Sequence, residues 1–161
     1  MQSISDRTFG LIVLFGSIIF LSGCSGRPIG LHDGRLYPCP NSPNCITSSS
    51  TGKNGVEPLR YSGPRKDAHS ALVSVLGNMS GARIVTARED YVHAEFRSSL
   101  FRFVDDVEFQ LPESPPVIYV RSAARSGYYD FGVNRRRMEQ IRSLFQQRMT
   151  LRMRQEISPT D

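Results

Sequence analysis

Hydrophobic and polar residues follow three different patterns along the chain. Residues 9–21 form an uncharged run that is almost wholly apolar. Residues 25–64 are rich in Gly, Pro, Ser and Asn and show little apolar periodicity, which is typical of a tether followed by irregular structure. From residue 65 onward, segments with helical or strand-like periods alternate with turn residues. The sequence therefore predicts most of its regular structure in this last part.

Two segments have the spacing of amphipathic helices. The first covers about residues 65–78, and the second begins near Asn134, a favourable N-cap residue, and ends before Ser158. The apolar positions that share one face are Ala68, Leu72, Val75 and Leu76 in the first segment and Met138, Ile141, Phe145 and Met149 in the second. We expect both faces to be buried.

Four runs between these helices alternate like strands, and they cover residues 83–89, 91–98, 101–111 and 117–122. The turns between them are short, which favours an antiparallel meander. The predicted fold class is therefore α+β, with an antiparallel four-stranded sheet and the helices packed on one of its faces.

One carboxylate interrupts the pattern of the third run. The alternation places Asp105 on the face expected to meet the core, and a buried carboxylate is costly unless it is paired and hydrogen-bonded. Arg121 is the best candidate partner, and Arg125 is the second. The apolar residues on the same face are Phe101, Phe103, Val107, Phe109 and Leu111. Asp106 and Glu108 point the other way with Arg102, and we expect them to be solvated.

The N-terminal run has the features of an export signal. Arg7 precedes it, and its thirteen residues would span only about 20 Å as a helix, whereas the hydrocarbon core of a bilayer is about 30 Å thick. Leu21-Ser22-Gly23-Cys24 follows and resembles the lipobox of bacterial lipoproteins. We expect cleavage before Cys24 and fatty acyl attachment to its thiol. The alternative is a plain secretory signal with a coincidental cysteine.

This interpretation divides the chain into a lipoprotein signal peptide over 1–23, a tether over 24–35, a single α+β domain over 36–157 and a disordered tail over 158–161. It places the protein in the cell envelope, anchored through lipid on the periplasmic side. Ser25 follows the modified cysteine, which favours sorting to the outer membrane.

The two remaining cysteines, Cys39 and Cys45, are six residues apart. An exported protein meets an oxidising compartment, so we expect them to form a disulfide. A zinc site would need two further ligands, and the histidines His32, His69 and His93 have no recognisable metal spacing. We expect no metal and no cofactor.

The formal net charge of +5 limits the classes of partner. Outside the cytoplasm, a modest basic excess favours an anionic lipid, a glycan or a wall polymer over nucleic acid. A solvated basic surface without a partner is the alternative, and the oligomeric state is not indicated. Arginines also line the last helix, where they could meet anionic headgroups or simply face solvent; they are Arg142, Arg148, Arg152 and Arg154.

Several segments together resemble a known family. They are residues 38–45 (PCPNSPNC), 93–98 (HAEFRS), 103–109 (FVDDVEF) and 121–137 (RSAARSGYYDFGVNRRR). In this order they are similar to the bacterial and plastid family called domain of unknown function 1499, over roughly residues 36–145. Family members often have serine where this chain has Ala124. The resemblance supports the domain limits and implies no established activity, substrate or cofactor.

Three hypotheses follow for the charged residues. In the first, the loop before the last helix binds an anionic group through arginine forks and free helix amides. In the second, the same residues with Asp105 form a buried structural network. The first two hypotheses share the residues Arg121, Arg125, Asp130, Asn134 and Arg136. In the third, the domain is a hydrolase acting on an envelope component, with His93 as base and Asp106 or Glu108 as acid, because carboxylates two apart on a strand are about 7 Å apart.

Overall fold

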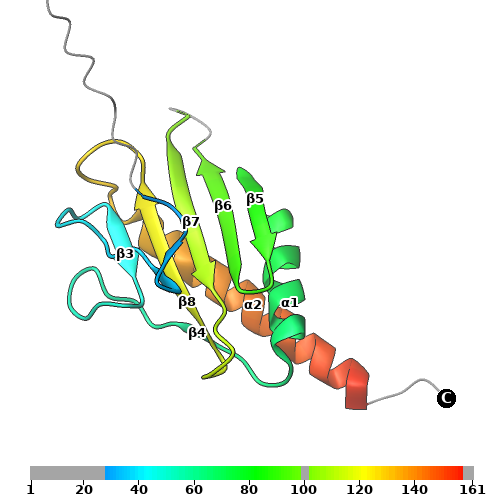
Figure 1. Ribbon diagram of the computed structural model, residues 1–161. Helices are drawn as coiled ribbons and strands as arrows, with labels where there is room; N and C mark the ends of the chain where they lie inside the picture. The colour runs from blue at the N-terminus through cyan, green and yellow to red at the C-terminus, as the bar shows by residue number, and fades with distance from the viewer. Residues whose placement is uncertain (1–27, 99–101, 158–161) are drawn as a thin grey trace, which may run out of the picture.

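The computed structural model describes residues 28–98 and 102–157. It is a two-layer α+β structure, in which two helices cover one face of a mostly antiparallel sheet (Figure 1). The predicted signal peptide over 1–23, Cys24, the start of the tether and the tail over 158–161 lie outside the described residues. Within the described part, no helix is long and apolar enough to cross a bilayer.

The centre of the sheet is the predicted meander. Its four strands are β5 (Ala82–Arg88), β6 (Tyr91–Arg97), β7 (Val104–Gln110) and β8 (Val117–Ala124), and each pairs antiparallel with the next. The strand β5 is an edge, and its register with β6 shifts between Ile84 and Thr86. Phe103, which the pattern assigned to the core, precedes β7 and is 57% exposed.

The sheet has six strands, whereas the sequence predicted four. Two short strands, β3 (Cys45–Thr47) and β4 (Leu59–Arg60), both pair with β8 on the side away from β7. They come from the segment that looked irregular, because strands of two or three residues are too short to show a period. Their backbone groups satisfy an edge of β8 that would otherwise be unpaired.

The helices α1 (Arg65–Gly77) and α2 (Val133–Ile157) lie behind the sheet in Figure 1. The predicted apolar positions of both helices are buried. They pack against the sheet residues Val92, Ala94, Phe96, Val107, Phe109, Ile118 and Val120. Burial of each large apolar side chain contributes about 1.5–3 kcal/mol, so this helix-facing layer supplies the hydrophobic core.

The opposite face of the sheet is partly covered by a small hairpin. Its strands β1 (Leu31–His32) and β2 (Arg35–Leu36) flank Asp33 and Gly34, which have φ of 49° and 72°. Two positive φ values are what a type I′ turn requires, and Asp-Gly is a preferred pair for it. Residues 28–35, assigned to a tether from their composition, therefore lie against the sheet instead of extending freely.

The predicted disulfide between Cys39 and Cys45 is present. Cys45 is the first residue of β3 and is buried, whereas Cys39 belongs to the segment that follows the hairpin. The bond therefore ties this proline-rich segment directly to the edge of the sheet.

Candidate functional site

A group of charged side chains lies on the sheet face away from the helices. His93, Asp106, Glu108 and Arg121 are 5%, 3%, 0% and 1% exposed. They come from β6, β7 and β8, where His93 is opposite Glu108 and Glu108 is opposite Arg121. The expectation that Asp106 and Glu108 are solvated is wrong, because the N-terminal segment covers this part of the sheet.

Glu108 is the centre of the first half of this group. Its carboxylate pairs with Arg121, accepts a hydrogen bond of 2.8 Å from the Tyr91 hydroxyl and accepts one of 2.7 Å from the Gly30 amide. Burial, followed by the neighbouring Glu108 charge, raises the pKa of Tyr91 above its usual range. The hairpin segment thus bonds directly to the buried ion pair, and a guanidinium nitrogen of Arg121 also lies 3.5 Å from the Pro28 carbonyl oxygen.

Asp106 is the centre of the second half. Arg125 donates to both of its carboxylate oxygens at 2.7 Å, and His93 Nε2 lies 2.8 Å from Oδ1. Burial opposes ionisation of Asp106, but the hydrogen bonds from Arg125 and His93 outweigh it and lower its pKa. Glu95 extends the group outward, because it accepts from both Arg83 and Arg125, and these bonds lower its pKa.

Asp105 belongs to the other face of the sheet. It is 8% exposed and pairs with Arg137 of α2 at 2.6 Å, so neither predicted partner is correct. Arg121 shares a face with Tyr119 and is directed away from the helices, because the core side of β8 is formed by Ile118 and Val120. The partner instead comes from a helix that packs over Asp105.

The start of α2 is held by Asp130. Its carboxylate accepts 2.9 Å hydrogen bonds from the backbone amides of Gly132 and Asn134. Burial alone would raise its pKa, but these hydrogen bonds lower it. Asn134 lies inside the helix rather than at its cap, and its buried amide group bonds to Ser122, Asp130 and the Asn44 carbonyl.

The arginines of this loop are used within the chain itself. Arg121 and Arg125 pair with carboxylates, Arg135 donates to the carbonyls of Lys53 and Gly55, and Arg136 donates to the Phe131 carbonyl. The structure therefore places the candidates for an anion-binding loop in hydrogen bonds that tie the loop to the domain.

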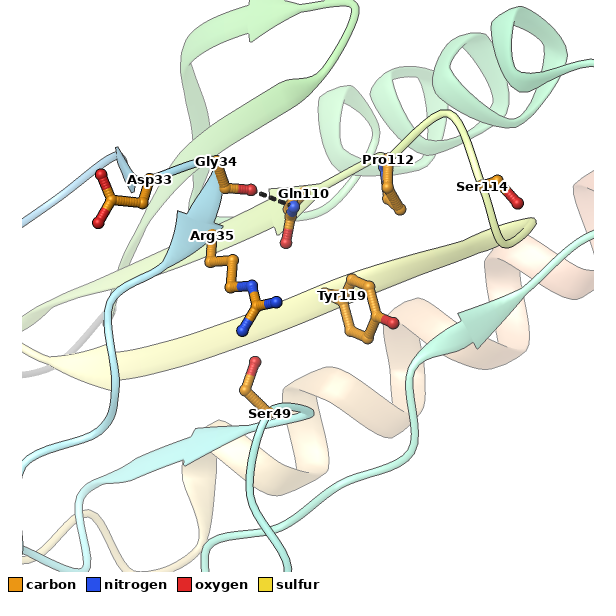
Figure 2. Close-up of a pocket in the computed structure, with 8 residues that line it drawn as sticks. All are labelled: Asp33, Gly34, Arg35, Ser49, Gln110, Pro112, Ser114 and Tyr119. Carbon is orange, nitrogen blue, oxygen red and sulfur yellow. Dashed lines mark hydrogen bonds between the residues drawn. The ribbon is translucent and has the colours of Figure 1, made fainter.

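An open groove of about 510 Å³ lies beside the buried group, on the same face of the sheet. Its lining residues are Asp33, Gly34, Arg35, Ser49, Gln110, Pro112, Ser114 and Tyr119. Figure 2 shows the guanidinium of Arg35 extending between Tyr119 and Ser49. Among the described residues, this guanidinium has no ion pair or hydrogen bond.

Sequence reasoning did not identify this groove. Arg35 was assigned to the tether, and Ser49 and Tyr119 are far from it along the chain. The available signal was Asp33-Gly34, which marks a hairpin turn and could have shown that Arg35 belongs to the folded part. Within the described ranges, no group of His, Cys, Asp and Glu side chains is arranged to hold a metal ion.

These features define a two-layer α+β domain with a covered ionic network and an adjoining polar groove. The chain belongs to the family described as protein of unknown function (DUF1499), whose model matches residues 35–145. That match confirms the resemblance seen in the sequence, and it includes both halves of the network. No curated protein and no solved structure has significant similarity to the chain.

Proposed function

We propose that the protein is a lipid-anchored component of the bacterial envelope whose domain binds an anionic, hydroxyl-rich ligand without catalysing a reaction. The anchor is supported by the apolar run over 9–21 and the lipobox-like residues that end at Cys24. The binding site is the groove around Arg35. The observation that carries the proposal is the guanidinium of Arg35 in this groove, which has no ion pair or hydrogen bond with any described residue.

The chemistry of the groove favours a sugar polymer with acidic groups. A guanidinium binds carboxylate or phosphate through two parallel hydrogen bonds. Ser49, Ser114 and Tyr119 line the groove with hydroxyl groups, and Gln110 adds an amide that already donates to the Gly34 carbonyl. Because the groove is open, a segment of a longer chain can lie along it, as an envelope glycan or wall polymer would.

Two earlier hypotheses have less support. The arginines of the loop before α2 already have partners, so a ligand there would have to displace the chain's own carboxylates and carbonyls. The hydrolase hypothesis requires substrate to reach His93 together with Asp106 or Glu108, but these side chains are at most 5% exposed and are hydrogen-bonded to other residues of the group.

Removal of the Arg35 side chain tests the binding proposal. With soluble muropeptides and phosphorylated lipopolysaccharide core as probes, we expect Arg35→Ala to weaken binding of at least one probe about tenfold or more, as loss of a charge-assisted contact does. Arg148→Ala is the matched control, since Arg148 is exposed on α2 and has no ion pair among the described residues. Equal binding by wild type and Arg35→Ala would refute the proposed site.

The anchor is tested separately by mass spectrometry of the mature protein. We expect the product to begin at Cys24 and to carry fatty acyl groups. An unmodified thiol at this position, or a retained Met1, would refute lipid anchorage without affecting the binding test.

A further inference from the structure

Large apolar side chains are exposed at one end of the domain. They lie before β7 and in the segment that connects β8 to α2, at the top of Figure 1. We call them the aromatic end, and they are Phe103 (57% exposed), Tyr128 (72%), Tyr129 (60%), Phe131 (78%) and Val133 (39%). Exposed apolar residues that gather in this way mark an interaction surface more often than scattered ones do.

Contacts join several of these residues to one another. The rings of Tyr129 and Phe131 meet edge to face, with centroids 5.2 Å apart. Val133 lines a shallow hollow together with Arg97 and Ser98. The Ser98 amide in turn donates to the Phe103 carbonyl at 2.9 Å.

The aromatic end is also positively charged. Arg97, Arg102 and Arg136 line hollows at this end, and none of them has a carboxylate partner within the described residues. Among the nearby carboxylates, Asp105 pairs with Arg137 and Asp106 with Arg125, whereas Asp130 is held by the backbone amides of Gly132 and Asn134. An anionic surface would therefore meet three arginines that no carboxylate of the described residues neutralises.

The described chain begins near the same end, within reach of the proposed anchor. Gly34 bonds to Gln110 at one end of β7, Gly30 bonds to Glu108 farther along, and Figure 1 shows the described chain beginning beside the C-terminal half of β8. Cys24 lies four residues before Pro28, and four extended residues span at most about 14 Å.

We propose that the aromatic end docks on the anionic surface of the bilayer that holds the lipid anchor. Tyrosine rings favour the boundary between headgroups and acyl chains, and phenylalanine can bury its ring below it. Arginines beside them attract phosphate and other anionic headgroups. A lipid chain combined with such a patch attaches a protein more firmly than either signal alone. This inference rests on the lipid anchorage proposed above.

Docking fixes the direction in which the groove faces. Pro112 and Ser114, which line the groove, belong to the turn between β7 and β8, whereas the aromatic end is at the opposite ends of these two strands. With the aromatic end on the membrane, the groove is held away from the bilayer and toward the polymers of the envelope. This orientation differs from the alternative in which the α2 arginines meet headgroups. Arg142 already donates to the Glu57 backbone carbonyl, and Arg152 pairs with Asp67.

The chain contains no tryptophan, so a single introduced indole can report on its own surroundings. Tyr129→Trp places one at the aromatic end, and Leu151→Trp places the control near the C-terminal end of α2, where Leu151 is 54% exposed. The lipid-modified protein is reconstituted into vesicles of phosphatidylcholine and phosphatidylglycerol, with or without brominated acyl chains. We expect bromine to quench the indole of Tyr129→Trp several-fold more than that of Leu151→Trp.

The outcomes separate docking from anchorage. If the protein does not float with the vesicles, anchorage and docking are both refuted. If it floats but the two indoles are quenched equally, docking is refuted and anchorage stands. Docking is also refuted, and anchorage again stands, if the shielding of the indole in Tyr129→Trp depends on protein concentration and not on brominated lipid. That result would assign this end to self-association. Joint Arg97→Glu and Arg136→Glu changes should reduce the quenching, whereas Arg148→Glu should not.

Discussion

Glu108 and Arg121 are opposite one another on neighbouring strands and form an ion pair that is shielded from solvent. Removing two charges from water is expensive, and their attraction repays this cost only when additional hydrogen bonds satisfy the remaining polar atoms. Tyr91 and the Gly30 amide supply such bonds to Glu108. Part of this compensation therefore depends on the N-terminal segment, which supplies the Gly30 amide.

Breaking this pair should be strongly destabilising. We expect Glu108→Gln to lower the free energy of unfolding by about 3–5 kcal/mol, because it leaves the Arg121 charge buried without a partner. Urea denaturation followed by circular dichroism measures the change. Arg88→Ala is the control, since its pair with Asp90 is exposed and should contribute less than about 1 kcal/mol. Similar losses for both variants would contradict the role assigned to the buried pair.

Tyr91 should make the fold sensitive to alkaline pH. Its pKa is raised in the folded state by burial and by Glu108, so folding favours the protonated phenol. The stabilisation is complete below the unfolded pKa of about 10 and is lost as pH rises above it. Tyr91→Phe should flatten the decline of stability above this pH, and phenolate absorbance should show one tyrosine that resists titration until the protein unfolds. A wild-type curve with the same alkaline decline as Tyr91→Phe would be inconsistent with this.

Asp106 should contribute the opposite pH dependence. Its folded pKa is lowered because hydrogen bonds from Arg125 and His93 outweigh the effect of burial. Its stabilisation is therefore present above the unfolded pKa of about 4 and is lost as pH falls below it. Asp106→Asn should be less stable than wild type at neutral pH, and the difference should shrink in acid. Thermal denaturation across this pH range measures it, and a constant difference would argue against the assigned ion pair.

The contribution of Asp105 to stability should depend on its ion pair with α2 rather than on the neighbouring strand. Asp105→Asn leaves Arg137 without its carboxylate in a position where the arginine side chain is only 12% exposed, and we expect a loss of about 2–3 kcal/mol. Adding Arg137→Met should recover part of that loss, whereas adding Arg121→Met should not. Double-mutant cycles in urea compare the two combinations. Recovery with Arg121→Met alone would mean that the pairing described here is wrong.

The meander and both helices could be predicted because their signals are local. The alternation in residues 91–97 and the apolar spacing from Met138 to Met149 are visible within one element, and packing preserved them. The short strands β3 and β4 could not be predicted in this way, since two or three residues carry no period. Asp33-Gly34 does indicate a hairpin turn, but the composition of the surrounding segment led to its assignment as a tether.

The ion pairs were harder to predict than the elements. In β8, apolar residues occupy both faces, with Val117 and Ile118 adjacent, so alternation did not show which face Arg121 belongs to. That ambiguity led to the wrong partner for Asp105. Burial of Glu108 depends on a hairpin that is 78 residues away along the chain, and its partner Arg121 is set by strand register rather than by local sequence.

The irregular edge of the sheet at β5 affects how neighbouring copies of the protein can associate at high concentration. An outer strand with free backbone groups can recruit a strand from another copy and start an aggregate. Here the register shift between Ile84 and Thr86 interrupts the regular spacing that such recruitment needs. The strand also carries charged side chains, since Arg83 pairs with Glu95 and Arg88 with Asp90. We therefore expect neighbouring copies to remain separate molecules instead of extending one another's sheets into fibres.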